Sequence, residues 1–288
     1  MDQADSLRRR LAGPARQRPP LRVIAVTSGK GGVGKTNVAA NLAVLASRSG
    51  RRVLILDADL GLANVEIVFG IRPRLHLGHL IDGSATLHDV LAVGPHGIQV
   101  LSAGSGVAEL SRLDEAQRLR LITALDPLED AFDTVIVDSG AGIGENVRFF
   151  VGAAQEAILV VSPEPTALTD AYAAVKVLSR TAGVRHFHVL VNQAPTEAAA
   201  RGVFDQLTGV AGRFLDARID YLGSLPRDEN LHRAIMAQTP LVDLFPLSPA
   251  SRALAAAADR LFQAPRPRHL DGGLKFLWQR LFREFSAT

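Results

Sequence analysis

The stretch Gly29-Lys30-Gly31-Gly32-Val33-Gly34-Lys35-Thr36 decides the fold, because it fits the phosphate-loop pattern G-x-x-x-x-G-K-[ST] and follows an apolar run at residues 23–26. Its four glycines allow the backbone N–H groups to turn inward around a triphosphate, at the start of a helix predicted over residues 38–47. Lys35 is expected to reach the outer phosphates, and the Thr36 hydroxyl is expected to ligate Mg²⁺. The stretch therefore predicts a nucleoside triphosphate and Mg²⁺ as ligands.

The composition limits the classes of protein that fit this chain. Its 288 residues, 47% of them hydrophobic, are enough for one large α/β domain or two small ones. The absence of cysteine excludes disulfides, thiolate metal sites and iron–sulfur clusters. The arginines near the N-terminus precede proline rather than an apolar segment, and no run of 18 uncharged apolar residues occurs. We therefore expect a cytoplasmic protein.

The net charge of +3 is concentrated at the two ends of the chain. Residues 1–22 hold six Arg against two Asp, and residues 265–288 hold five Lys or Arg against two acidic residues, so that the remainder carries a net charge of −4. This distribution argues against a folded DNA-binding face and indicates that partners bind at the ends.

Two further apolar runs end in carboxylates. Residues 53–56 lead into Asp57 and Asp59, and residues 134–137 lead into Asp138. Continuous apolar runs of this length are typical of strands buried on both faces of a parallel sheet. Because the carboxyl ends of such strands meet beside the phosphate loop, these acids are expected near the metal and the attacking water. A capping or turn-forming role is the alternative for Asp57 and Asp59.

Three more apolar runs, at residues 98–102, 157–161 and 188–191, and a last short strand that begins at Tyr221 complete the predicted sheet. Helices over residues 229–237 and 249–262 close the domain. The fold class predicted from these elements is α/β. It is a single doubly wound domain with a mostly parallel sheet flanked by helices, and its ligand lies at the carboxyl ends of the strands.

Four histidines between residues 69 and 106 suggest a metal site at first sight: His76, His79, His88 and His96. Their spacings place no two of them at i, i+4 on a clear helix face, and no carboxylate joins them in a known pattern. We therefore expect ordinary polar histidines.

The second lysine of the loop, Lys30, is not required by ordinary phosphate-loop chemistry. With it, the loop resembles the K-G-G-x-G-K-[ST] loop of the deviant-Walker ATPases of the MinD/ParA family, which are P-loop NTPases of the SIMIBI type. The resemblance implies Mg²⁺-dependent ATP hydrolysis by a homodimer that encloses two ATP molecules, with Lys30 reaching the partner's nucleotide. It makes Lys30 and Asp59 the catalytic residues, since Asp59 positions the attacking water.

The resemblance also assigns ligand-binding roles. Thr36, Asp57 and Asp138 surround the metal. Asn192 reads the adenine edge, which suits an amide that offers a donor and an acceptor together, although a turn-forming asparagine is the alternative. Pro226 and Asp228 line the adenine or the ribose. The complete set of nucleotide-binding residues is Gly29, Lys30, Gly31, Gly32, Val33, Gly34, Lys35, Thr36, Asn64, Asn192, Pro226 and Asp228.

Residues 1–20 form a basic arm with a Pro/Arg-rich spacer, which by composition alone is typical of a disordered tail. However, its first residues match the D-Q-A-x-x-L-R arm of the flagellar, FlhG-type branch of the family. The matching positions are Asp2, Gln3, Ala4, Leu7 and Arg8. In that branch the arm stimulates an FlhF-type GTPase of the signal-recognition class, so the resemblance implies such a partner. Residues 21–262 then form the ATPase domain.

Residues 263–273 are predicted to be a linker, and residues 274–288 an amphipathic helix. Lys275, Arg280 and Arg283 lie mostly opposite an apolar stripe, with Phe276 at its edge. The flexible tether, the aromatic side chains and the positive charge favour an anionic membrane surface, and core packing is the alternative. The expected membrane-binding residues are Leu274, Phe276, Leu277, Trp278, Leu281, Phe282 and Phe285.

The function predicted from these features is an ATP-dependent dimerising switch that regulates flagellar number and placement. It would act in the cytoplasm and reversibly at the inner face of the cell membrane. Two alternatives share its motifs: a ParA-type partition ATPase that binds nonspecific DNA, and a nucleotide-gated anti-activator of a flagellar transcription factor. A switch-complex protein is a further possible partner, and specific nucleic-acid binding is not expected.

Overall fold

The computed structural model describes residues 21–59, 64–104, 123–125, 127–154 and 156–264. Two sets of predicted binding residues lie outside the described residues: the arm from Asp2 to Arg8 and the stripe from Leu274 to Phe285. Residues 60–63, which follow Asp59, also lie outside them, and so does most of residues 113–128, whose apolar spacing predicts a helix.

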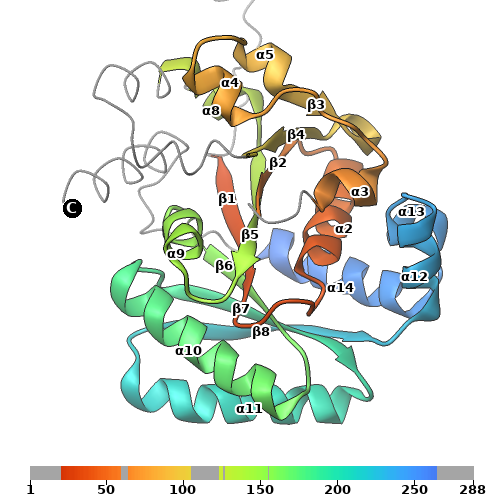
Figure 1. Cartoon of the computed structure of the whole chain (residues 1–288). Helices are drawn as coiled ribbons and strands as arrows, with labels where there is room; N and C mark the ends of the chain where they lie inside the picture. Colours follow the sequence, from red (N-terminus) through yellow and green to blue (C-terminus); the bar gives the residue numbers. More distant parts are fainter. Residues whose placement is uncertain (1–20, 60–63, 105–122, 126, 155, 265–288) are drawn as a thin grey trace, which may run out of the picture.

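The described chain forms an eight-stranded sheet of order β3-β4-β2-β5-β1-β6-β7-β8 (Figure 1). Every neighbouring pair is parallel except β3 and β4, which are antiparallel. The prediction of a mostly parallel α/β sheet is therefore confirmed. The strands are β1 (Arg22–Ser28), β2 (Val53–Ala58), β3 (Leu91–Val93), β4 (Gln99–Ser102), β5 (Thr134–Ala141), β6 (Glu156–Val161), β7 (His186–Ala194) and β8 (Arg218–Pro226).

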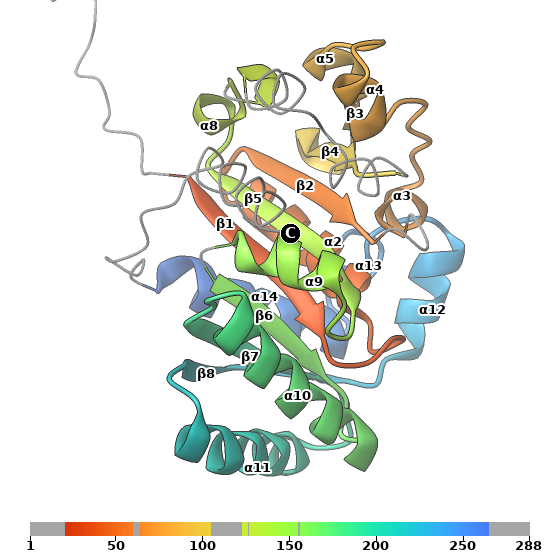
Figure 2. The same cartoon turned by 60° about the vertical axis from the view of Figure 1, so that its left-hand side comes forward.

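Helices cover both faces of this sheet (Figures 1 and 2). One face packs against α9 (Glu145–Gly152), α10 (Pro165–Thr181) and α11 (Glu197–Phe214), and the other against α2 (Lys35–Arg48) and α14 (Pro249–Gln263). The shorter elements are α3 (Val65–Phe69), α4 (Leu77–Ile81), α5 (Leu87–Val90), η1 (Pro95–Gly97), α8 (Pro127–Ala131), α12 (Glu229–Met236) and α13 (Leu241–Leu244). None of the helices among the described residues is long and apolar enough to cross a membrane.

The alternation of side chains along β1 explains this layering. Val23 and Ala25 belong to the core on one face of the sheet, whereas Ile24 and Val26 belong to the core on the other. Successive side chains of a strand point to opposite faces, so a continuous apolar run is stable only when helices cover both.

Two predicted boundaries shift in the structure. The strand predicted over residues 134–137 continues to Ala141, so that Ser139 and Gly140 lie in β5, and α14 ends at Gln263, one residue beyond the predicted end of the domain. The antiparallel edge strand β3 was not predicted, because its three residues are partly exposed and too short to show a period.

Three of the four histidines in the region from residue 69 to 106 form side-chain hydrogen bonds with other described residues. The Nδ1 atom of His76 accepts from the N–H of Gly78, and the Nδ1 atom of His79 accepts from the N–H of His76, which together cap α4. His96 Nε2 lies 2.9 Å from an Asp243 carboxylate oxygen.

Candidate functional site

The phosphate loop connects β1 to α2 in a conformation that requires glycine. Gly32 and Gly34 have φ angles of 76° and 93°, which are strained for other residues. A Cβ atom on Gly29 would lie 2.2 Å from the backbone carbon of Asp170 in α10. Two of the glycines therefore allow the turn, and a third allows α10 to approach the loop.

A cavity of about 510 Å³ lies over this loop. Lys35 and Thr36 line it from the start of α2, and Asp59 and Asn64 line it from the segment that follows β2. Asn64 also stands directly before α3, as its N-cap residue. The structure thus brings together the predicted phosphate-binding residues and both ends of the segment after β2.

A second cavity, of about 260 Å³, continues from the first one. The two share Gly34, Asn37 and Ile235 among their lining residues, and the second is also lined by Asn192, Pro226 and Asp228. The two cavities together have phosphate-binding groups at one end and the predicted base-binding residues at the other. Their combined space is large enough for a whole nucleotide.

The polar groups of Asn192 already have protein partners. Its Nδ2 atom donates to the Val33 carbonyl at 2.8 Å, and its Oδ1 atom accepts from the N–H of Gln193. A Cβ atom on Gly34 would lie 2.5 Å from that Nδ2 atom. Asn192 therefore braces the phosphate loop, and its contact with adenine stays a prediction.

The carboxylate of Asp228 is also engaged. One oxygen accepts from the N–H of Asn230 and caps α12, and the other accepts from the N–H of Ala250 at the start of α14. Asp228 lines the second cavity while holding two helices together, so its contact with the ribose stays a prediction as well.

Asp57 and Asp138 lie side by side, as register partners on β2 and β5. Asp138 is fully buried, and neither of its carboxylate oxygens has a hydrogen-bond partner among the described residues. Burial raises the pKa of Asp138 to about 7; the nearby Thr36 hydroxyl opposes this shift and the charge of Asp57 adds to it. Burial also raises the pKa of Asp57 to about 6, although the hydrogen bonds from the N–H groups of Asp59 and Val65 lower it.

These observations fit a Mg²⁺ ion. Two buried carboxylate oxygens without a hydrogen-bond partner among the described residues lie next to a second carboxylate and a hydroxyl, and together they form a set of hard oxygen ligands. The pKa values of both acids stay raised, because the charge of Lys35 beside Asp138 does not offset the cost of burial. A divalent cation held by Thr36, Asp57 and Asp138 would supply the positive charge that favours the ionised form of both acids.

Asp59 and Lys30 lie on different sides of the loop. Asp59 is half-buried and lines the phosphate cavity, 3.8 Å from the position that a Cβ atom on Gly140 would take. Lys30 is exposed and is not among the residues that line the cavity. Its Nζ atom lies 2.8 Å from Glu164 Oε2, and this hydrogen bond raises the pKa of Lys30.

Several site residues were missed by the sequence analysis. Glu164, which pairs with Lys30, is 134 positions away in the chain, and only its place directly before α10 could have drawn attention to it. Asn37, His232 and Ile235 line the second cavity from α2 and α12. They belong to no motif, and only the packing of α12 against the loop side of the sheet reveals them.

We expect Asp138→Asn to raise the free energy of unfolding of the nucleotide-free, Mg²⁺-free protein near pH 8 by about 2 kcal/mol. The pKa of about 7 in the folded state lies above the ordinary value of 3.8. Stability from the protonated form is therefore complete below about pH 4 and is lost as the pH rises through about 7. Asparagine does not ionise, so the gain should be smaller near pH 5 and disappear below about pH 4.

Urea unfolding in the presence of EDTA, at about pH 5 and about pH 8, measures this difference. Asp82→Asn is the control, because the Ser84 hydroxyl and N–H lower the pKa of this exposed carboxyl, and no gain near pH 8 is expected from its removal. Equal stability of Asp138→Asn and the wild type at both pH values would contradict the proposed cost of ionisation.

A family model, curated relatives and solved structures all indicate the same protein family for this chain. A family model of the CobQ/CobB/MinD/ParA nucleotide binding domain matches residues 24–241. The antiactivator FleN of Pseudomonas aeruginosa is 45% identical over 262 residues, which cover 91% of this chain and 94% of the relative. The flagellum site-determining protein YlxH of Helicobacter pylori is 30% identical over 264 residues, covering 90% and 89%.

A solved structure agrees with the fold. The septum site-determining protein MinD from Pyrococcus horikoshii, complexed with Mg-ADP, superposes with a TM-score of 0.66 and 25% identity over 86% of this chain and 99% of its own. The resemblance inferred from the phosphate loop is thereby confirmed. The chain belongs to the CobQ/CobB/MinD/ParA family of nucleotide-binding proteins and is an ATPase of the MinD/ParA type.

Proposed function

We propose that this ATPase is a dimerising switch that regulates flagellar number and placement. Its relatives FleN and YlxH, named as an antiactivator and as a flagellum site-determining protein, support a flagellar role. In this proposal two chains close around two ATP·Mg²⁺, bind the membrane and their partners as a pair, and separate after hydrolysis.

The position of Lys30 carries the proposal. Each phosphate cavity already contains one buried lysine, Lys35, whereas Lys30 stands outside the cavity on the exposed rim, paired with Glu164. A lysine in this place can bind the nucleotide of a second subunit that docks over the rim. Its ammonium group then leaves the Glu164 carboxylate and contacts a phosphate of the partner's nucleotide instead. Exposed ion pairs contribute little to stability, so this exchange of partners costs little.

Within one subunit, each residue has a distinct task. The loop N–H groups and Lys35 bind the phosphates, and Thr36, Asp57 and Asp138 would hold the metal. Mg²⁺, when bound, neutralises charge on the phosphate oxygens. Asp59 lines the same cavity and is placed to orient a water molecule toward the outermost phosphate.

The hydrogen bonds of Asp57 suggest how hydrolysis reaches the rest of the molecule. Its Oδ1 atom accepts from the N–H of Asp59 and its Oδ2 atom from the N–H of Val65, so one carboxylate holds both ends of the segment between them. When this carboxylate turns toward a metal, both ends lose a partner. The segment would thus respond to the nucleotide state, as switch segments do.

We expect Lys30→Ala to abolish ATP-dependent dimerisation while leaving ADP binding within a few-fold of the wild type. Sedimentation velocity with ATP·Mg²⁺ or ADP·Mg²⁺ measures the first effect, and calorimetry the second. Lys176→Ala is the matched control, because this lysine is exposed on α10 and does not line the nucleotide cavities. A Lys30→Ala protein that still dimerises with ATP would contradict the proposed role of Lys30.

The two ends of the chain supply the proposed targets of the switch. The arm of Asp2, Gln3, Ala4, Leu7 and Arg8 would stimulate an FlhF-type GTPase, and the residues of the C-terminal stripe would bind an anionic membrane. A single short amphipathic helix binds reversibly, whereas two linked copies bind far more tightly. Dimerisation by ATP could thereby control residence at the inner face of the membrane.

We expect the wild type to sediment with anionic phospholipid vesicles in ATP but not in ADP, and a chain that ends after Ala264 to remain in the supernatant. This truncation keeps α14 complete, since the helix ends at Gln263. Trp278→Glu should abolish sedimentation, whereas Gln279→Glu, which adds the same charge on the opposite side of the predicted helix, should reduce it only slightly. If the truncated chain still sediments with the vesicles, residues 274–285 are not the membrane anchor, and core packing is then the interpretation of their apolar stripe.

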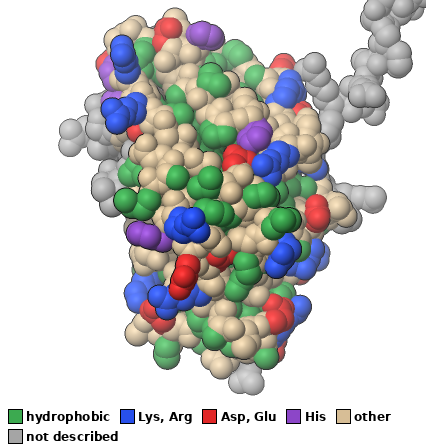
Figure 3. All heavy atoms as spheres, turned by 90° about the vertical axis from the view of Figure 1, so that its right-hand side faces the viewer, with side chains coloured by type: hydrophobic (Ala, Val, Ile, Leu, Met, Phe, Trp, Pro, Cys, Tyr) green, Lys and Arg blue, Asp and Glu red, His purple; other side chains and the backbone are tan. Residues whose placement is uncertain are grey.

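Experiments can distinguish this proposal from two other functions, those of an anti-activator and of a partition ATPase. The name of the relative FleN favours an anti-activator of a flagellar transcription factor. If cells that carry the Asp59→Ala variant had the same flagella as wild-type cells, ATP hydrolysis would be incidental to that role. Partition on nonspecific DNA would require binding that depends strongly on salt and survives deletion of residues 1–20. On the side of α12 and α13, positive, negative and hydrophobic side chains are interspersed, which does not favour DNA on that face (Figure 3).

A further inference from the structure

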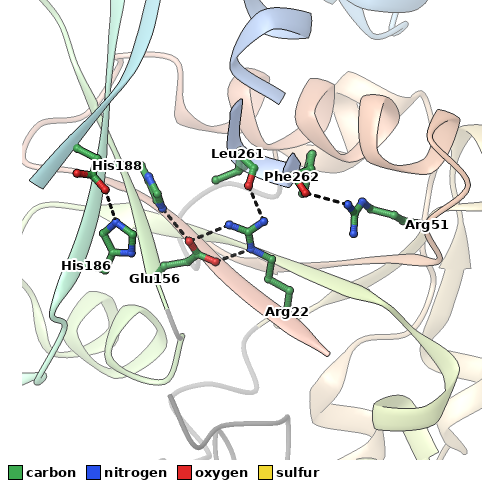
Figure 4. A network of polar contacts seen from close by, with 8 residues as sticks. Arg22, Arg51, Glu156, His186, His188, Leu261 and Phe262 are labelled. Atoms are coloured by element: carbon green, nitrogen blue, oxygen red, sulfur yellow. Dashed lines mark hydrogen bonds and ion pairs between the residues drawn. The ribbon is translucent and has the colours of Figure 1, made fainter. Parts of the chain in front are cut away.

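A cluster of buried polar residues lies at the end of the sheet opposite to the phosphate loop (Figure 4). Glu156 is the first residue of β6 and His186 is the first residue of β7, whereas the phosphate loop follows the last residue of β1. His186 and His188 are two positions apart on one strand and therefore point to the same face. Asp220, from β8, and Arg22, from β1, complete the cluster.

The two histidines and Glu156 are close enough to share one ion. Glu156, His186 and His188 each offer a ligand atom, and these atoms all lie within 4.8 Å of one another. His188 Nε2 lies 2.7 Å from Glu156 Oε2, and His186 Nε2 lies 2.7 Å from Asp220 Oδ2. The two imidazole rings have their centroids 4.2 Å apart.

We propose that Glu156, His186 and His188, with Asp220 beside them, bind a divalent transition-metal ion of the Zn²⁺ class. Two imidazoles and one or two carboxylates are a ligand set that suits Zn²⁺, Co²⁺ or Ni²⁺, and thiolates are not needed. On binding, each imidazole offers the lone pair of Nε2 to the ion and carries its proton on Nδ1, so that metal–ligand bonds replace the His188–Glu156 and His186–Asp220 hydrogen bonds. Each nitrogen–oxygen pair then opens slightly to admit metal–ligand bonds of about 2.0–2.2 Å.

Among the side chains of this cluster, the exposed fraction differs from one to the next. The side chain of Glu156 is 1% exposed and that of His188 is 7% exposed, whereas Asp220 is 36% exposed. A cation can therefore enter past Asp220 and His186 and end at the buried carboxylate. Partial burial also excludes most competing water, which strengthens the metal–ligand bonds.

Two arginines limit the affinity of this site. Arg22 donates to both carboxylate oxygens of Glu156, at 2.5 and 2.9 Å, and Arg218 donates to Asp220 at 2.8 Å. They neutralise the two acids, so the ion enters a site without net negative charge. We expect tighter binding when the exposed Arg218 is removed, because Asp220 then becomes available as a ligand.

The test is a titration of the full, untagged chain with Co²⁺, in the presence of ADP and excess Mg²⁺ to occupy the nucleotide site. One Co²⁺ per chain should give visible absorption of tetrahedral type, and Zn²⁺ should displace it. His186→Ala and His188→Gln should each weaken binding by about 10–100-fold or more, and Arg218→Ala should strengthen it. His188→Gln keeps a hydrogen-bonding group in the buried position, and retained ADP binding shows that the variant is folded.

His76→Ala and His79→Ala serve as matched controls. Their ring centroids are also 4.2 Å apart, but these two side chains cap a helix, and neither belongs to the described metal-ligating group. They should leave Co²⁺ binding unchanged. Absent Co²⁺ absorption, or absorption that survives His186→Ala and His188→Gln, would show that the cluster is a hydrogen-bond network only.

Discussion

Asp59→Ala lowers the rate of ATP hydrolysis by about 10²–10⁴-fold while ATP binding stays within a few-fold of the wild type; this is the larger of the two main effects that we expect. The magnitude is that of a group that positions or deprotonates the attacking water. Asp59 is the half-buried carboxylate that lines the cavity with Lys35 and Thr36, whereas Asp57 and Asp138 are more deeply buried.

Binding should survive because the affinity for the phosphates comes from other groups. The loop backbone, Lys35 and Thr36, which line the phosphate cavity, are unchanged in this variant. The variant should therefore accumulate as an ATP dimer, in contrast to Lys30→Ala, which should bind nucleotide as a monomer. Comparing turnover with sedimentation thus separates hydrolysis from assembly.

Phosphate release measures turnover, and calorimetry with a non-hydrolysable ATP analogue measures binding. Asp216→Ala is the control, since the Asp216 side chain is 96% exposed and lies at the opposite end of the sheet, two residues before the start of β8. Undiminished turnover in both Asp59→Ala and Lys30→Ala would refute the two-subunit mechanism.

The second large effect concerns stability. Arg22→Met is expected to lower the free energy of unfolding by about 3–5 kcal/mol, because it leaves the buried carboxylate of Glu156 without its cation. The Arg22 side chain is 2% exposed, and its guanidinium also donates to the carbonyl of Leu261 at 2.6 Å, near the end of α14. Removing the guanidinium therefore leaves the Leu261 carbonyl without this hydrogen-bond donor and the Glu156 carboxylate without its cation (Figure 4).

Two comparisons identify the cause. Arg185→Met breaks the exposed pair with Asp216 and should change the free energy of unfolding by less than about 1 kcal/mol. Arg22→Met combined with Glu156→Met should recover part of the loss, because no buried charge is then left unpaired. A single Arg22→Met variant as stable as the wild type in urea would contradict the assignment.

The same pair predicts a dependence on acid. Burial tends to raise the pKa of Glu156, but the hydrogen bonds from His188 and Arg22 outweigh it and lower the pKa to about 2. The stability of this pair is therefore complete above the ordinary value of 4.5 and is lost as the pH falls toward 2. Arg22→Met should remove much of this loss. Asp57 and Asp138, with raised pKa values, act in the opposite direction and at higher pH.

Much of the fold could be predicted because the necessary signals are local. Apolar runs buried on both faces, each followed by a glycine or a carboxylate, indicate parallel strands, and parallel strands bring their carboxyl ends together. The proximity of Asp57 and Asp138 to the loop followed from this rule alone. The edge strand β3 and the short helices lack such a period, so their existence depends on what they pack against.

The remaining features of the site could not be read from local pattern. The partner of Lys30, the two helices held by Asp228 and the brace from Asn192 to Val33 join residues that are up to 159 positions apart. Residue type shows that each group can form a hydrogen bond, but not which neighbour is within reach. The His186–His188 pair was overlooked for the same reason, since its carboxylates come from two other strands.

The sequence by itself determined the phosphate loop, the acids beside it and the parallel order of the strands that carry them, because backbone conformation and burial follow from residue type over a few positions. Only the tertiary structure decided that the buried Asp138 oxygens have no hydrogen-bond partner among the described residues, that Lys30 stands outside its own cavity, and that a second polar cluster lies at the far end of the sheet. Desolvation and ion pairing depend on neighbours that are distant in the chain, and these become defined only once the sheet and its helices have packed.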